Sequence, residues 1–466
     1  MSERAKISKE HNGLGTDTIF QLLIRYAIPS IVSMVVMSLY NIVDQLFIGW
    51  GVGYLGNAAT TVAFPIVTVG LALALLIGNG SAAFISLELG RGNSDKANRT
   101  LGNALTLVMV SGIFISVLGL VFLQPILRAM GATEAFMPYA VEYTSVILMG
   151  MPFAMLSPAI ASIIRADGSP RYSMISTLAG AVLNTILDPI FIFGFDMGVK
   201  GAAIATVISQ IFSAVLILGY VLHHGKVLTF SPENLKLKWD IVKKQCAFGS
   251  SSFVTQMSIV VVNVVMNNSL TYYGAQSAYG SEIPLSAMGI VLKINAILIS
   301  CILGVAIGAQ PILGFNYGAG NYNRVKRTYK TEIAFALTLS SIVCLMFITV
   351  PQVFVRAFGD SSLAFNSFAT HALRTAMCCV FIAGFQIPSA GYFQAVGKPL
   401  KAMILNMTRA LFCQVTFVLI LPLFFGLDGI LYALPATDVI SSLLTMIFIA
   451  KELRHLDAAG CTAANA

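Results

Sequence analysis

The chain has 466 residues, of which 57% are hydrophobic and only 10% are charged. This balance excludes a soluble globular domain, in which about a quarter of the residues are charged. The formal charge of +8 does not indicate a nucleic-acid binder, because the basic residues stand between apolar segments instead of gathering on one face. We therefore expect a polytopic, all-α membrane protein.

Apolar stretches of about 20 residues, each long enough to cross the hydrocarbon core of a bilayer, recur along the chain. They predict twelve transmembrane helices at 22–46, 56–84, 98–124, 138–164, 173–195, 201–223, 246–273, 284–310, 331–352, 363–390, 401–424 and 429–451. Residues 1–20 are polar and mixed in charge, so they do not have the pattern of a cleavable signal peptide.

Lysine and arginine alternate between the connections. The N-terminal stretch, with Arg4, Lys6 and Lys9, and the connections after even-numbered spans hold 22 basic residues, whereas the other connections hold three. Basic residues are enriched in cytoplasmic connections. This asymmetry predicts that both termini are cytoplasmic; the bacterial inner membrane is implied only by the family resemblance described below.

The two halves of the chain repeat one another. Gly90-Arg91-Gly92-Asn93 recurs as Gly318-Ala319-Gly320-Asn321, and the connection at Gly168 recurs at Gly397. The offset is 318 − 90 = 228 in the first case and 397 − 168 = 229 in the second. The repeat predicts two pseudo-symmetric six-helix lobes, with spans 1–6 in residues 1–223, a cytoplasmic linker at 224–245, spans 7–12 in 246–451 and a cytoplasmic tail at 452–466.

Two carboxylates lie inside predicted spans of the first half. Asp44 is in the first span and Asp188 is in the fifth, four residues after Asn184 and therefore on the same helix face. Thr206 lies in the sixth span. A carboxylate inside the membrane is costly unless it is protonated, paired or bound to a cation, so these residues are candidates for a shared proton or a bound sodium ion.

The second half has no acidic residue at the matching positions, because Cys413 and Phe417 stand opposite Asn184 and Asp188. We therefore expect the cation site in the first half. Lys293, in the eighth span, is a possible counter-ion or gate, with a snorkelling or paired lysine as the equal alternative. Arg374 and Arg409 are interpreted as structural.

Motifs for nucleotide hydrolysis, nucleophilic catalysis and metal binding are missing. The sequence contains no phosphate-binding Gly-x-x-x-x-Gly-Lys-Ser/Thr loop, no Gly-x-Ser-x-Gly and no His-Glu-x-x-His. We expect neither an enzyme nor a cofactor, and an ion gradient is then the expected source of energy.

Several stretches resemble the multidrug and toxic compound extrusion (MATE) family over essentially the whole chain. They are Ala27-Ile28-Pro29, Leu39-Tyr40-Asn41-Ile42-Val43-Asp44, Arg165-Ala166-Asp167-Gly168-Ser169-Pro170, Asn184-x-x-x-Asp188-Pro189 and Gly198-x-x-Gly201-Ala202-Ala203-x-Ala205-Thr206. The missing acidic residues in spans 7 and 10 make the chain look closer to the bacterial DinF-like and small multidrug-exporter branch.

The resemblance implies a function and a site. It implies a secondary antiporter that exports amphipathic, often cationic, drugs in exchange for H⁺ or Na⁺, acts as a monomer and contributes to antibiotic resistance. The implied coupling site consists of Asp44, Asn184, Asp188 and Thr206, which would bind the metal ion if Na⁺ is coupled. Pro29, Tyr143 and Asn41 would support helix bending and that site.

Two other functions stay open. A flippase for lipid-linked saccharide or lysolipid would need several basic residues for phosphate, and Lys293 alone supports it. A membrane-embedded enzyme would need a catalytic constellation, and the sequence has none.

Overall fold

The computed structural model of the chain describes residues 13–134, 136–280, 282–356 and 363–464. The predicted basic residues Arg4, Lys6 and Lys9 lie outside these ranges. All the regular elements within them are helices, with no β-strand in the described segments. The first half comprises α2 (Ile19–Val52), α3 (Tyr54–Gly90), α4 (Ser94–Val121), α5 (Leu123–Ala129), α6 (Met137–Ala166), α7 (Pro170–Pro189) and α8 (Gly198–His223).

The second half follows a short 3₁₀ turn at Pro232–Leu235. It comprises α9 (Trp239–Ala275), α10 (Glu282–Gly318), α11 (Tyr322–Thr349), α12 (Pro351–Arg356), α13 (Leu363–Ala376), α14 (Ala383–Ala395), α15 (Pro399–Met407), α16 (Thr416–Ile420), α17 (Pro422–Phe425) and α18 (Leu427–Ala464). The segment 224–238 between α8 and α9 is called the linker below. The predicted span at 246 thus begins inside α9, and α18 continues through the predicted start of the tail at 452.

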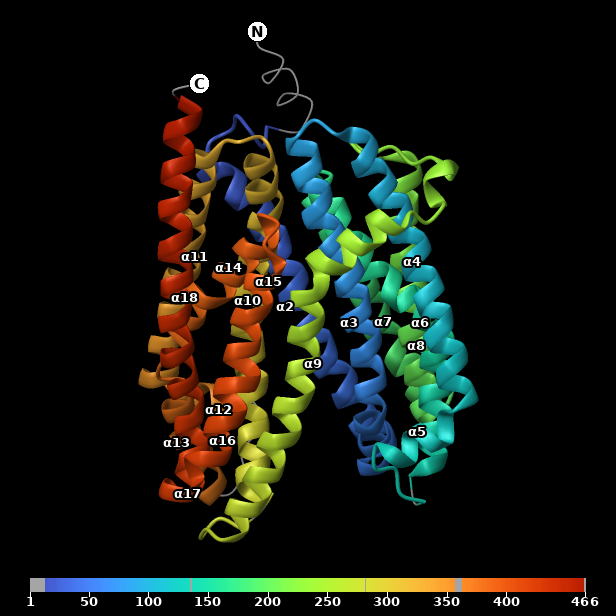
Figure 1. Cartoon of the computed structure of the whole chain (residues 1–466). Helices are drawn as coiled ribbons and strands as arrows, with labels where there is room; N and C mark the ends of the chain where they lie inside the picture. The colour runs from blue at the N-terminus through green and yellow to red at the C-terminus, as the bar shows by residue number, and fades with distance from the viewer. Residues whose placement is uncertain (1–12, 135, 281, 357–362, 465–466) are drawn as a thin grey trace.

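The helices have the length and hydropathy of membrane spans. In the described ranges, eleven helical segments qualify singly, and the pair formed by α13 and α14, bent by 46° at its break, supplies a twelfth. The prediction of an all-α protein with twelve transmembrane helices is confirmed, with the bent pair α13 and α14 counted as one span. The start of α2 and the end of α18 lie at the same end of the bundle, here called the terminal end (Figure 1).

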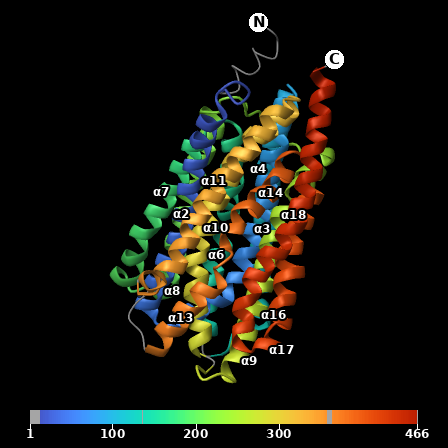
Figure 2. The same ribbon diagram turned by 90° about the vertical axis from the view of Figure 1, so that its left-hand side faces the viewer.

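Each lobe has its own hydrophobic core. One cluster joins buried side chains of α3, α4, α6 and α8, including Ile85, Leu148 and Ile217. Another joins α10, α11, α13 and α18, including Val291, Phe347 and Leu431. α11 and α18 lie side by side on the outside of the second lobe in both views (Figures 1 and 2).

The first helix of each half crosses to the other lobe near the terminal end. Leu23 and Ala27 of α2 pack in a cluster with α10, α11 and α14, whereas Ile48 packs with the first lobe. α9 behaves likewise, because Gln245 donates hydrogen bonds to Ser81 Oγ and the Thr100 carbonyl of the first lobe, 2.9 Å each. The lobes are therefore joined at the terminal end, and the ribbons diverge toward the other end (Figure 1).

Glycines allow the helices to approach closely at these crossings. A Cβ added to Gly308 of α10 would lie 2.6 Å from the Cα of Ala27. A Cβ on Gly249 of α9 would collide with the Leu76 backbone of α3. Small residues permit such backbone contact between membrane helices.

Spans 5 and 11 contain π-helical turns, at Ile190–Gly194 and Thr408–Val415. The first follows Pro189, whose missing N–H interrupts the regular ladder of hydrogen bonds. Turns of this kind occur frequently at functional sites.

Candidate functional site

A polar cluster lies in the first lobe where α2, α7 and α8 meet. Pro170 at the first position of α7 starts that helix, and Asn184 and Asp188 follow on one buried face of it. Their side chains are 1% and 0% exposed. The helix thus presents an amide and a carboxyl, one turn apart, to the interior of the lobe.

The Asn184 amide connects the two helices of the cluster. Its Nδ2 donates to Asp188 Oδ1 at 3.2 Å and to Thr206 Oγ1 of α8 at 3.3 Å. Tyr40 of α2 approaches Thr206 from the other side. α2 therefore contributes to one polar group with α7 and α8, although it is far from both in sequence.

Asp44 completes the group from α2. The carboxyl groups of Asp44 and Asp188 lie close enough to interact electrostatically. One proton shared between them would join them by a hydrogen bond, because a carboxylate alone has no hydrogen to donate. Two like charges at this distance would otherwise repel strongly in a poorly solvated site.

Three oxygens of the cluster are buried and have no hydrogen-bond partner among the described residues. They are Asp44 Oδ1, Asn184 Oδ1 and Asp188 Oδ2. Unpartnered buried oxygens are costly, and such groups are typical of sites that bind an ion or water. The cluster contains two carboxyls, one amide and one hydroxyl, which suits a proton or a hard cation such as Na⁺.

Two tyrosines border the carboxyls. Tyr143 of α6 is 8% exposed and lies within electrostatic range of Asp44, Tyr40 and Asp188. Sequence reasoning singled out Tyr143 but missed Tyr40. The signal was present, because Tyr40 precedes Asp44 by four residues and therefore shares its helix face.

The other predicted residues lie apart from this cluster. Asn41 is exposed and donates to the Met37 carbonyl of its own helix at 2.8 Å. Pro29 is buried, and it stands fifteen residues before Asp44, which is about 22 Å along a straight helix. Lys293 is exposed on α10 and forms no ion pair with any residue that the structure describes.

The second lobe holds a buried carboxyl that sequence reasoning missed. Glu332 of α11 is 0% exposed, and neither of its oxygens has a hydrogen-bond partner in the described ranges. Its position at the edge of the predicted span 331–352 concealed it, because glutamates at span ends are ordinarily solvated. Buried acidic residues are therefore not confined to the first lobe, although the Asp44–Asp188 pair is.

The remaining intramembrane charges have structural partners. Arg409 contacts Asp438 Oδ1 at 3.1 Å, and Arg374 donates to the Ile348 carbonyl at 3.1 Å. These contacts agree with the interpretation of both arginines as structural.

Asp167, in the turn between α6 and α7, holds the start of the linker. Its carboxylate accepts hydrogen bonds from the backbone N–H groups of Lys226, Val227 and Leu228 and from the Tyr220 hydroxyl, at 2.7–2.9 Å. Burial raises the pKa of this carboxyl, while the four donors act in the opposite direction by stabilising its charged form.

Most of the chain matches a known protein family and several named proteins. A sequence profile of the MatE family matches residues 29–190 and 252–420. The multidrug export protein MepA of Staphylococcus aureus (strain N315) is 25% identical over 433 residues, covering 92% of this chain and 93% of that protein. MepA of Staphylococcus haemolyticus (strain JCSC1435) is 26% identical over 443 residues, covering 94% of each chain.

Solved structures share the fold. One, described as the outward-facing conformation of a multidrug resistance MATE family transporter, superposes with a TM-score of 0.90 at 24% identity and covers 96% of this chain and 99% of its own. A crystal structure of MATE in complex with MaL6 gives the same TM-score at 23% identity and covers 98% and 100%.

Proposed function

Because the chain belongs to the multidrug and toxic compound extrusion family, whose members are transporters and not enzymes, we propose that it exports amphipathic, often cationic, small molecules in exchange for H⁺ or Na⁺. The relatives that carry the name multidrug export protein support this substrate class.

The observation that carries the proposal is the carboxyl pair. The carboxyls of Asp44 and Asp188 lie close together, and each has a buried oxygen without a partner among the described residues. A pair that holds one proton can release it, and the vacated oxygens can then bind a cation. The site is thus suited to a neutral and an anionic state, which is the property that ion-coupled transport requires.

Drug and proton compete in this scheme through charge. A cationic drug is favoured by the ionised pair, whereas a proton entering from outside neutralises the pair and lowers the affinity for the drug. Net inward movement of positive charge is assisted by the membrane potential, by about 2.3 kcal/mol per charge at 100 mV. If Na⁺ is coupled instead, Asn184 and Thr206 act as ligands beside the two carboxylates.

α2 contributes residues to the site in the first lobe and also packs against the second lobe. It supplies Asp44 and Tyr40 to the cluster in the first lobe, while Leu23 and Ala27 pack against the second. A change of charge at Asp44 therefore acts on a helix that contacts both lobes. We propose that this helix, with Pro29 as its point of bending, transmits protonation to the relative position of the lobes.

The proposed setting is a bacterial inner membrane with the terminal end in the cytoplasm. The support is the distribution of basic residues, since the lysines of 224–245 lie in the linker or the first turns of α9, and Arg324, Lys326 and Arg327 lie in the first turns of α11, all at that end. Both lobes, joined by the linker, are proposed to form one functional monomer.

The decisive experiment is uptake of a fluorescent cationic drug into inverted vesicles that contain the protein, with a proton gradient and a sodium gradient imposed separately. We expect one of the two gradients to drive uptake into the vesicles. Uptake that neither gradient accelerates would contradict the antiport proposal, and a protein that moves lipid-linked saccharide but no drug would favour the flippase.

A further inference from the structure

An apolar groove of about 410 Å³ opens on the outer face of the first lobe, between α4, α6, α8 and the linker. Val110 of α4, Phe153 of α6 and Leu222 of α8 contribute to its helical walls, and Phe230 and Leu235 of the linker close one end. Val110 and Leu222 are each 53% exposed. The groove therefore faces lipid and is closed on the side of the terminal end by a segment that does not cross the membrane.

Hydrogen bonds from α4 fix the linker in this place. Asn98 donates to Thr229 Oγ1 at 2.9 Å and accepts from the Thr229 N–H at 3.0 Å. Asn103 donates to the carbonyls of Asn234 and Lys236, at 3.2 and 3.3 Å, and accepts from the Lys238 N–H at 2.7 Å.

Thr106, which lines the groove, already has a hydrogen-bond partner. The Thr106 hydroxyl donates to the Leu235 carbonyl at 2.8 Å, so it offers no free donor to the groove. With Asp167 holding residues 226–228, the linker is attached at both ends. The position of the linker beside the groove is thus fixed by hydrogen bonds to α4 and to Asp167.

The residues after Leu235 have the character of the membrane–water interface. Leu237 and Trp239 are 47% and 77% exposed. Lys236 precedes Leu237, and Lys238 lies between the two apolar residues. Tryptophan with neighbouring lysines is enriched at the depth of the lipid headgroups. The closed end of the groove therefore lies at headgroup depth, and its open wall lies along the hydrocarbon.

Positive charge gathers at this closed end. Lys236 directly follows Leu235, and Arg99 is exposed one turn before Asn103 on α4. The whole segment 224–245 holds five lysines against Glu233 and Asp240. Cytoplasmic leaflets contain anionic lipids, and basic pockets beside membrane helices bind their headgroups.

We propose that this groove binds one acyl chain of an anionic phospholipid, with the phosphate at Lys236 and Arg99. The apolar walls match the chain, and the basic residues match the headgroup. The proposal rests on the proposed orientation, since it requires the terminal end to face the leaflet that contains the anionic lipid. Bound lipid would hold the linker against α4 and so stabilise the first lobe.

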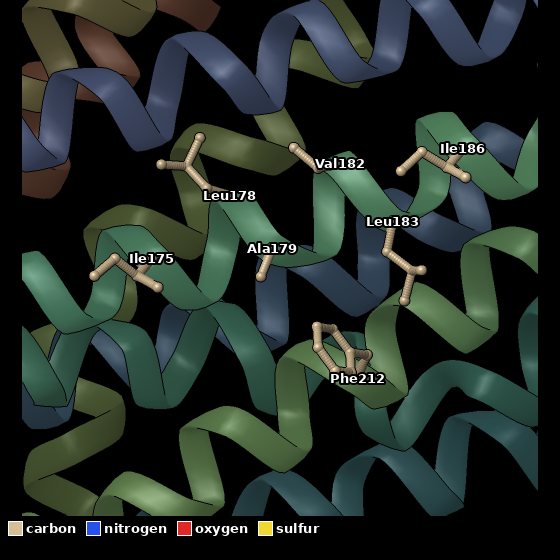
Figure 3. Close-up of a pocket in the computed structure, with 7 residues that line it drawn as sticks. All are labelled: Ile175, Leu178, Ala179, Val182, Leu183, Ile186 and Phe212. Atoms are coloured by element: carbon tan, nitrogen blue, oxygen red, sulfur yellow. The ribbon is translucent and has the colours of Figure 1, made fainter.

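A second groove provides a matched control. It has a volume of about 460 Å³ and is lined by apolar residues of α7 and by Phe212 of α8, with no wall from the linker. Figure 3 shows Leu183 of α7 and Phe212 of α8 extending toward one another. Val182, on its rim, is 55% exposed.

The test uses the full-length protein in detergent, titrated with phosphatidylglycerol or with phosphatidylcholine of identical chains. Binding is measured by native mass spectrometry and thermal unfolding. We expect phosphatidylglycerol to bind more tightly and to raise the unfolding temperature. Val110→Trp should fill the groove and abolish this binding, and Lys236→Gln should weaken it roughly fivefold, whereas Val182→Trp should leave it unchanged.

Each alternative outcome contradicts the proposal. Equal binding of the two lipids would remove the role of the basic residues. Unchanged binding of phosphatidylglycerol to Val110→Trp would show that the chain lies elsewhere, and loss of binding in Val182→Trp would assign it to the α7 groove. Drug transport serves as a separate readout, because failure of antiport leaves this lipid binding unaffected.

Discussion

Asp44 on α2 and Asp188 on α7 bring their carboxyl groups close together, although α3, α4, α5 and α6 separate the two helices along the chain. A proton shared by the pair would hold the two carboxyls together, whereas two negative charges would repel one another. The relationship links the protonation of the site to the contact between α2 and α7, and most of the predictions below follow from it.

We expect Asp44→Asn and Asp188→Asn each to abolish gradient-driven drug export without lowering the amount of protein in the membrane. Asparagine keeps the size and a hydrogen-bond donor but cannot bind or release the proton. The measurement is drug uptake into inverted vesicles, with protein quantified on blots. Asn41→Ala is the control, because Asn41 is exposed outside the cluster. Full transport by either aspartate variant would exclude the pair from coupling.

Affinity for a cationic drug should fall as the pH is lowered between about 9 and 5, because protonation removes the negative charge that attracts the drug. Equilibrium binding to purified protein, with and without sodium, is the measurement. If Na⁺ competes, Asn184→Ala and Thr206→Ala should weaken the sodium effect, since a hard cation needs several oxygen ligands. Affinity unaltered by both pH and sodium would contradict competition in either form.

Glu332→Gln should retain ion-coupled export and should unfold at the same or a higher temperature. A fully buried carboxyl without partners among the described residues is stable only when neutral, and glutamine is neutral and of similar shape. Glu332→Lys should fail to accumulate, because it introduces an unpaired charge. Should Glu332→Gln lose coupling as Asp188→Asn does, the second lobe would share in coupling.

Gly308→Leu should shift the protein away from the conformation in which the lobes pack at the terminal end. The added side chain would displace Ala27 of α2, and overpacking of this kind costs about 1–3 kcal/mol. Spin labels at the exposed positions 95 and 327 should report longer distances. Gly289→Leu on the same helix is the control, since no described atom lies within 4 Å of its added Cβ. Equal distances in the Gly308 variant and the parent would refute the prediction.

Single cysteines in a cysteine-free background test the orientation. We expect labelling by an impermeant reagent at positions 52 and 280 in intact cells, and at 95 and 233 only after permeabilisation. The reason is the excess of lysine and arginine at the terminal end. Labelling at 233 in intact cells would reverse the proposed orientation.

The sequence alone determined the class of the protein, because long apolar segments with few charges have no other stable environment than the bilayer. It also determined the repeat and the shared face of Asn184 and Asp188, since helical periodicity is a local property.

Only the tertiary structure decided which helices meet. Asp44 and Tyr40 reach Asp188 and Thr206 because α2 packs against both α7 and α10, and no local pattern specifies that crossing. The burial of Glu332 and the attachment of the linker to α4 could not be predicted from the sequence for the same reason. Each depends on contacts between segments distant in the chain, whose energies are absent from local sequence periodicity.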